Sequence, residues 1–183
     1  MRCFSDLSIS IYLASCSINT ASKTIIRRVL ELGIGVLYFW DLQFKFWAWK
    51  ENLNHESDLS FKESLDHLGS KAYTDFLKNE LNITDWQIDK DKINKLYRSL
   101  SNTIHGKYVT FETISEKSFE CDSEEYKAIL SDIIRCENIL ISCFKSRFNE
   151  QYEELRVNHM PSVDRFKYVY EYQRSRTPSS RQM

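Results

Sequence analysis

Residues 93–107 read I-N-K-L-Y-R-S-L-S-N-T-I-H-G-K, and their spacing separates an apolar face from a polar one. At about 100° per residue, a helix would gather its apolar and aromatic side chains on one stripe. That stripe holds Ile93, Leu96, Tyr97, Leu100 and Ile104. About a third of a turn away, a polar face would hold Arg98, Ser101, Asn102 and His105. The pattern predicts an amphipathic helix whose apolar stripe packs on a core.

Arg98 and His105 would share a face of this helix because they are seven residues, or two turns, apart. Their Cα atoms would then lie about 10 Å apart along the axis, which lets both long side chains reach one phosphate group. Gly106 is the residue type that a helix C-terminus prefers. His105 would therefore sit in the last turn, where the helix dipole stabilises its protonated form by about 0.3–1 kcal/mol.

A longer apolar and aromatic helix is predicted upstream, from Asn19 or Thr20 to about Asn52. Gly33 and Gly35 lie in its interior, where each costs about 1 kcal/mol relative to alanine. We therefore expect another helix, of this chain or of a second subunit, to approach closely at these glycines.

The fold class follows from the scarcity of turn residues. The 183 residues include only 4 Gly and 2 Pro, too few for the turns of a β-sheet protein of this length. With the long periodic segments, this predicts an all-α protein: a single-domain helical bundle of about four to six helices. Residues 5–16 should form a short helix that packs through Leu7, Ile11 and Leu13.

Cap residues mark the starts of further helices. A Ser or Asp whose side chain accepts from the backbone two or three residues later satisfies donors that the helix leaves open. The predicted caps are Ser60 with Glu63 for a helix ending at Gly69, Thr84 or Asp85 for the helix of residues 93–107, and Asp122 with Glu125 for a last long helix.

The domain organisation predicted from these patterns is a helical domain over residues 1–160 and a C-terminal extension over residues 161–183. The extension should be a short helix after Pro161, followed by a disordered basic tail. From Leu155 to Met183, six basic residues stand against two acidic ones, a net charge of +4. The whole chain has a net charge of −1, so any contact with a nucleic acid should be local.

The aromatic residues between Tyr38 and Trp49 leave two interpretations open. Most of them are expected to line the bundle core, while leftovers such as Phe46 and Trp49 form an exposed apolar patch and hence an interface. Alternatively, the aromatic residues stack on bases or bind a partner.

Several classes of site and location are disfavoured. Five cysteines form no C-x-x-C pair, and the histidines outside residues 93–107 lack ligand spacing, so neither a metal nor any other cofactor is expected. Cys136 and Cys143 should be small buried residues. No Gly-rich phosphate loop occurs. The apolar run from Leu32 ends at Asp41, too short for a membrane span, and reduced thiols fit a cytoplasmic protein without a membrane partner.

The segment L-Y-R-S-L-S-N-T-I-H-G resembles the signature of the HEPN superfamily, all-α domains in which a His follows an Arg near a helix end. Upstream, T-I-I-R-R-V-L-E-L-G-I-G-V-L-Y-F-W-D followed by F-W-A-W-K is similar to the first helix of bacterial HEPN-like proteins. Ser99 stands where nucleases of the superfamily often carry Asn, Asp or His.

The resemblance implies a metal-independent endoribonuclease whose catalytic residues are Arg98 and His105. It also implies a site shared across a homodimer, with Ser101, Asn102 and Lys107 as substrate-binding residues. Such a protein would cut tRNA or mRNA as a toxin or as an anti-phage, abortive-infection effector. Its partner protein would be an antitoxin, a nucleotidyltransferase or an ATPase.

A non-catalytic alternative stays open: a HEPN-like subunit that holds a protein or RNA within a defence or toxin–antitoxin complex. In that case Arg98 would pair with an acid such as Asp91 or Glu112, and His105 would only cap carbonyls at the helix end.

Overall fold

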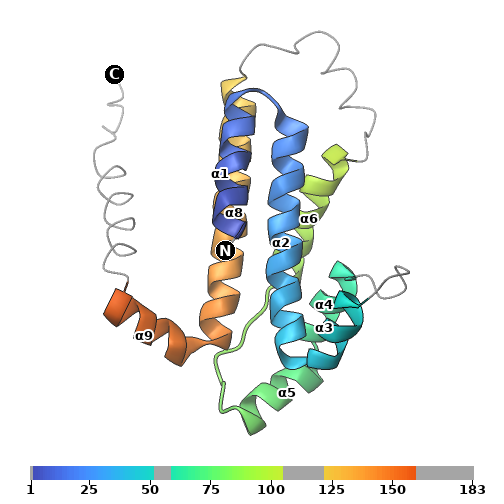
Figure 1. The fold of residues 1–183 in the computed structure, drawn as a ribbon, viewed down its shortest axis with the longest axis vertical. Coiled ribbons are helices and arrows are strands. Elements are labelled where there is room, and N and C mark those ends of the chain that lie inside the picture. Colours follow the sequence, from blue (N-terminus) through green and yellow to red (C-terminus); the bar gives the residue numbers. More distant parts are fainter. Residues whose placement is uncertain (1, 52–58, 105–121, 160–183) are drawn as a thin grey trace, which may run out of the picture. The chain divides into compact units, whose positions relative to one another are not determined.

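The computed structural model describes residues 2–51, 59–104 and 122–159, and within these ranges the chain is helical with no strand (Figure 1). The predicted all-α class is confirmed. These ranges contain eight helices, more than the four to six expected. One reason is that the long helix predicted from Asn19 to Asn52 is two helices in the structure.

The chain divides into two compact units, residues 1–146 and 147–183. The first unit holds the long helices α1 (Arg2–Ser15), α2 (Asn19–Asp41), α6 (Lys90–Ile104) and α8 (Ser123–Arg147), the last of which ends at the division. It also holds the short helices α3 (Gln43–Lys50), α4 (Phe61–Leu68) and α5 (Lys71–Glu80). The second unit begins with α9 (Asn149–His159). The boundary predicted between residues 160 and 161, the terminal helix and the tail lie outside the described residues, as does residue 112.

Helix α2 is the centre of the first unit, since it packs against α1, α4 and α6. Its fully buried side chains include Ile26, Leu30, Ile34 and Leu37. Removing a side chain of this kind from water contributes about 1.5–3 kcal/mol. Helices α6 and α8 complete the same core with Ile93, Leu100, Ile129 and Cys136.

At Gly33, α8 comes close to α2. A Cβ atom added at Gly33 would overlap the side chain of Leu140 on α8, so the expected close approach of a helix is confirmed there. At Gly35 the near neighbour is the side chain of Leu59, 2.6 Å from such a Cβ, and Leu59 belongs to no helix.

Helix α1 packs through a different face from the one predicted. Ile11 is exposed, whereas Asp6, Ser10 and Ala14 are buried. Ser10 Oγ lies 2.9 Å from Ser22 Oγ, and Ser22 Oγ donates to the Ser10 carbonyl at 2.9 Å. The packed stripe at i, i+4 and i+8 consists of small or polar residues, so hydrophobicity alone selected the wrong one.

The predicted caps have mixed outcomes. Ser60 Oγ accepts from Glu63 N at 3.2 Å, and Asp122 Oδ1 accepts from Glu124 N at 2.9 Å, as expected. Thr84 and Asp85 do not cap the helix that carries Arg98, because that helix begins at Lys90.

The two cysteines of α8, Cys136 and Cys143, are buried as predicted. Burial raises the pKa of Cys143 to about 11, which keeps its thiol protonated near neutral pH. No helix within the described ranges is both long and apolar enough to cross a membrane.

Candidate functional site

The candidate site is the polar face of α6, and its geometry starts with how the helix is held. Asp89 is the capping residue, since its Oδ1 accepts from Lys92 N at 2.9 Å. The preceding segment is fastened by Trp86, whose ring is buried and whose Nε1 donates to the Leu68 carbonyl at 3.0 Å. This anchor keeps residues 81–89 non-helical, which explains why α6 starts later than Thr84 or Asp85 would require.

The predicted apolar stripe of α6 is confirmed where the structure describes it. Ile93, Leu96 and Leu100 are at most 3% exposed. They pack α6 against α2 and thereby orient the opposite face outward. The side chain of Ile104 lies outside the described part.

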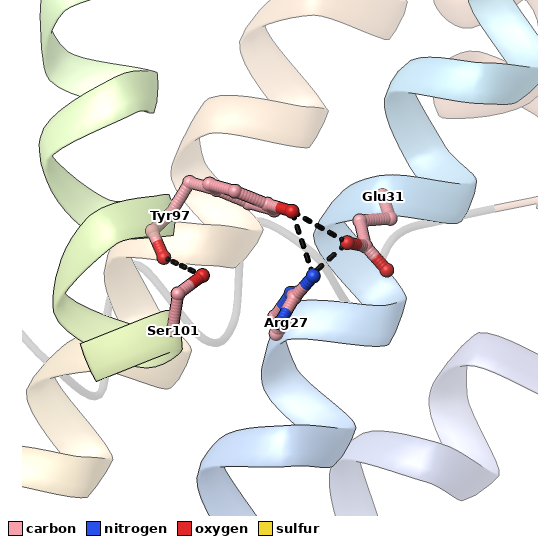
Figure 2. A network of polar contacts seen from close by, with 4 residues as sticks. All are labelled: Arg27, Glu31, Tyr97 and Ser101. Atoms are coloured by element: carbon pink, nitrogen blue, oxygen red, sulfur yellow. Dashed lines mark hydrogen bonds and ion pairs between the residues drawn. The ribbon is translucent and has the colours of Figure 1, made fainter. Parts of the chain in front are cut away.

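Tyr97, the remaining member of the stripe, joins a polar network with α2 (Figure 2). Its hydroxyl accepts from Arg27 Nη2 at 2.7 Å and donates to Glu31 Oε1 at 3.0 Å. Arg27 Nε donates to the same carboxylate oxygen at 3.0 Å, which closes a triangle of three polar groups. The phenol ring stacks on Phe61 of α4 with centroids 4.1 Å apart. Tyr97 therefore ties α6 to α2 and α4 together.

The electrostatics of this network follow from partial burial. Burial raises the pKa of Tyr97, the hydrogen bond to Glu31 adds to the rise, and the charge of Arg27 opposes it. Burial disfavours the charge of Arg27, but Glu31 and Tyr97 outweigh that effect and raise its pKa overall. Both shifts favour a protonated Tyr97 beside a charged Arg27.

Arg98 follows Tyr97 directly, and its side chain is exposed. Within the described ranges it forms no ion pair or hydrogen bond through its guanidinium, and Asp91 is not its partner. As far as the described residues are concerned, all five N–H donors of Arg98 are open to an incoming anion.

Two predicted substrate-binding residues lie on α6 beside Arg98. Asn102 is exposed, and Ser101 is partly buried with its Oγ donating to the Tyr97 carbonyl at 2.7 Å (Figure 2). The proton of Ser101 is thus used inside the helix, which leaves its lone pairs to accept a hydrogen bond. His105 and Lys107 lie outside the described residues. The structure brings Arg98, Ser101 and Asn102 together on one helix and does not locate the other two.

A second polar cluster, which the sequence did not indicate, joins the end of α2 to α3, α4 and α5. Glu63 Oε1 accepts from Tyr38 Oη at 2.8 Å and from Lys45 Nζ at 3.0 Å. The His67 ring lies between the rings of Tyr38 and Tyr73, at 5.3 and 5.1 Å. Only the spacing of Glu63 and His67 on one helix face could have suggested this cluster in advance.

The pKa values in the second cluster are shifted in defined directions. Hydrogen bonds from Tyr38 and then Lys45 lower the pKa of Glu63. Burial, followed by the bond to Glu63, raises the pKa of Tyr38. Burial lowers the pKa of His67, against the raising effect of Asp41 and Glu63. The cluster therefore favours a neutral imidazole beside an ionised carboxylate.

The Arg27–Glu31–Tyr97 network was also missed by the sequence interpretation. Arg27 and Glu31 are four residues apart, the spacing of an ion pair on a helix, but nothing local to Tyr97 signals that its hydroxyl completes the network. Among the described residues, no group of three or more His, Cys, Asp or Glu side chains is arranged to hold a metal ion.

Comparisons with protein-family models, with curated proteins and with solved structures found no match for this chain.

Proposed function

We propose that the protein is a HEPN-type, metal-independent endoribonuclease that acts as a toxin or anti-phage effector, with Arg98 and His105 as its catalytic pair. The observation that carries the proposal is the exposed guanidinium of Arg98, which has no acidic partner in the described part of α6 or its neighbours. The sequence supplies His105 two turns further along the same face.

The proposed reaction is transfer within the RNA chain. The 2′-oxygen attacks the adjacent phosphorus, the bond from phosphorus to the 5′-oxygen breaks, and a 2′,3′-cyclic phosphate and a 5′-hydroxyl result. Arg98 neutralises the negative charge that grows on the phosphoryl oxygens. His105 moves the proton from the attacking 2′-hydroxyl towards the departing 5′-oxygen. Neither step requires a metal ion. In the composite site that the resemblance implies, each of two subunits contributes its own Arg98 and His105.

The packing of α6 supports this role for Arg98. Ile93, Leu96 and Leu100 fix one side of the helix, and the bonds of Tyr97 to Arg27 and Glu31 fix its rotation. A helix held on two sides fixes the position from which the Arg98 side chain reaches out, so that binding a phosphate orders only the side chain.

The test is cleavage of a pool of tRNA and mRNA by purified protein in the presence of a chelator. We expect wild type to cut and to leave cyclic phosphate ends, and Arg98→Ala and His105→Ala to be slower by about 10²-fold or more. The control is Lys92→Ala, which removes an exposed cation from the first turn of α6 and should cut like wild type. Cutting that persists in Arg98→Ala, or no cutting by a folded wild type, would contradict the proposal.

A non-catalytic binding subunit is the second candidate, and the exposed aromatic side chains of α3 favour it. Expression in a bacterial host separates the two functions. Toxicity that His105→Ala relieves supports the nuclease. Normal growth with wild type, together with a stoichiometric partner that co-purifies through α3, supports the binding subunit.

A further inference from the structure

The end of α2 and the whole of α3 carry an exposed aromatic patch, defined here as Trp40, Phe44, Phe46, Trp47 and Trp49. Their exposed fractions are 57, 83, 38, 54 and 37%, respectively. Phe46 and Trp49 contact each other and also the ring of Phe39, with centroids 5.4–6.2 Å apart. The patch is therefore built on an organised group of rings. The sequence interpretation that placed most of these aromatics in the core is wrong for Trp40, Phe44 and Trp47, whereas the expected exposure of Phe46 and Trp49 is confirmed.

The apolar area of the patch is large for a monomer and suited to a dimer. The exposed fractions amount to roughly 2.7 aromatic residues, or roughly 400–700 Å² at about 150–250 Å² each. The largest patch on a typical monomer is about 300–600 Å². A stable interface buries about 800 Å² on each partner, of which about 65% is apolar in homodimers, or roughly 500 Å². The aromatic side chains of the patch therefore account for a large part of the apolar area of such an interface, with Phe44 and Trp47 on the outward side of α3.

The charges around the patch distinguish between partners. Residues 40–51 include Asp41, Lys45, Lys50 and Glu51, whose charges cancel. Lys45 Nζ lies 3.0 Å from Glu63 Oε1, and Lys50 Nζ lies 4.0 Å from Glu51 Oε1. A nucleic acid or an anionic membrane is drawn to an excess of basic residues, which this surface lacks. A surface that carries both signs in equal number is complementary to a second copy of itself rotated by a two-fold axis.

We infer that the aromatic patch is a homodimer interface in which α3 of one subunit packs against α3 of another. The rings of Phe44 and Trp47, the most exposed on α3, form the centre. The charged residues at the rim pair across the two-fold axis, and because exposed pairs such as Lys45–Glu63 contribute little within one chain, they are exchanged at little cost. The inference rests on the residues of α3 and not on the nuclease proposal, whose composite site would require contact between subunits at α6 as well.

The experiment is sedimentation equilibrium of the full chain, with tryptophan emission followed over the same concentrations. We expect wild type to approach twice its mass of 21.8 kDa at micromolar concentrations. Its emission should shift to shorter wavelength as it associates, because three of its four tryptophans belong to the patch. Phe44→Ser with Trp47→Ser should weaken association about 30-fold or more, the loss typical of two central aromatic residues.

The matched control is Tyr12→Ser, which removes an aromatic ring that is 66% exposed on α1 and should leave association unchanged. Phe44→Ser alone is a second variant, and at 83% exposure its ring cannot be needed for folding of the monomer. The inference is overturned if wild type stays monomeric at 100 μM (about 10⁻⁴ M, a weak limit for a specific interface). It is also overturned if the double variant associates as tightly as wild type. A monomer whose emission shifts only with phosphatidylserine vesicles or single-stranded oligonucleotide would assign the patch to that ligand.

Discussion

Helices α2 and α3 follow each other in the chain and are both rich in apolar and aromatic residues, yet they are buried to opposite extents. Nine residues of α2 are buried, whereas none of α3 is. Leu42 separates them with a backbone conformation that is not helical. The difference arises from neighbours: α1, α4 and α6 pack around α2, while α3 is a single short helix at its end. Aromatic density therefore marks either a core or an interface, and the number of packing partners decides which.

The same contrast separates the two functional proposals. The packed side of α2 holds α6, and through Tyr97 it fixes the helix that presents Arg98. The aromatic rings at the end of α2 and on α3 are instead exposed, although the polar cluster around Glu63 lies nearby. In these proposals, the rigid packing of α6 on α2 serves catalysis. The exposed apolar area at the end of α2 and on α3 serves association.

The largest expected difference between the two helices is in stability. Leu30→Ala on α2 should lower the free energy of unfolding by about 2–5 kcal/mol, because Leu30 is fully buried and its loss leaves a cavity. Phe44→Ala on α3 removes a larger side chain but should change it by less than about 0.5 kcal/mol. Urea unfolding at low protein concentration, where association does not contribute, gives both values. Similar losses would show that α3 is packed.

A smaller effect is expected where polar contacts hold α2 to α6. Tyr97→Phe keeps the ring stacked on Phe61 and removes the hydroxyl that Arg27 and Glu31 share. The free energy of unfolding should fall by about 0.5–1.5 kcal/mol. The control is Tyr12→Phe, which alters an exposed ring and should be neutral. Equal free energies of unfolding for wild type and Tyr97→Phe would show that the network does not stabilise the packing of α6 on α2.

The smallest effect is a pH dependence of the free energy of unfolding, caused by His67 of α4 in the polar cluster at the end of α2. Burial lowers the pKa of His67 in the folded protein below the ordinary value of 6.5. The unfolded chain therefore takes up this proton first, so the contribution of His67 is present above pH 6.5 and declines as the pH falls below it. Unfolding free energies at pH 7.5 and 5.5 should differ less in His67→Gln than in wild type. A larger decline in the variant would reverse the assigned direction.

The sequence alone predicts the features that depend on local periodicity and on helix caps. The all-α class, the stripe of Ile93, Leu96 and Leu100 and the caps at Ser60 and Asp122 all depend on residues within a few turns of one another. The packed face of α1 was not predictable in the same way, because Ser10 is buried only through its pairing with Ser22 on another helix.

The remaining differences also have tertiary causes. No Gly or Pro marks the break at Leu42, and Tyr73 Oη donates to Asp41 at 2.7 Å from a helix that follows much later in the chain. Trp86 sets the start of α6 through a carbonyl 18 residues away. Within the candidate site, the exposure of Arg98 follows from periodicity, but the network that orients its helix requires two helices brought together.

The central claim is that Arg98 and His105 cleave RNA through its 2′-hydroxyl, and one comparison tests it directly. Wild type, Arg98→Ala and His105→Ala are each incubated with an RNA pool and with a fully 2′-O-methylated oligonucleotide of mixed sequence. We predict that wild type cuts only the RNA, leaves 2′,3′-cyclic phosphate ends, and loses about 10²-fold or more of its rate in each variant. Cutting of the methylated strand, or equal rates in all three proteins, would contradict the claim.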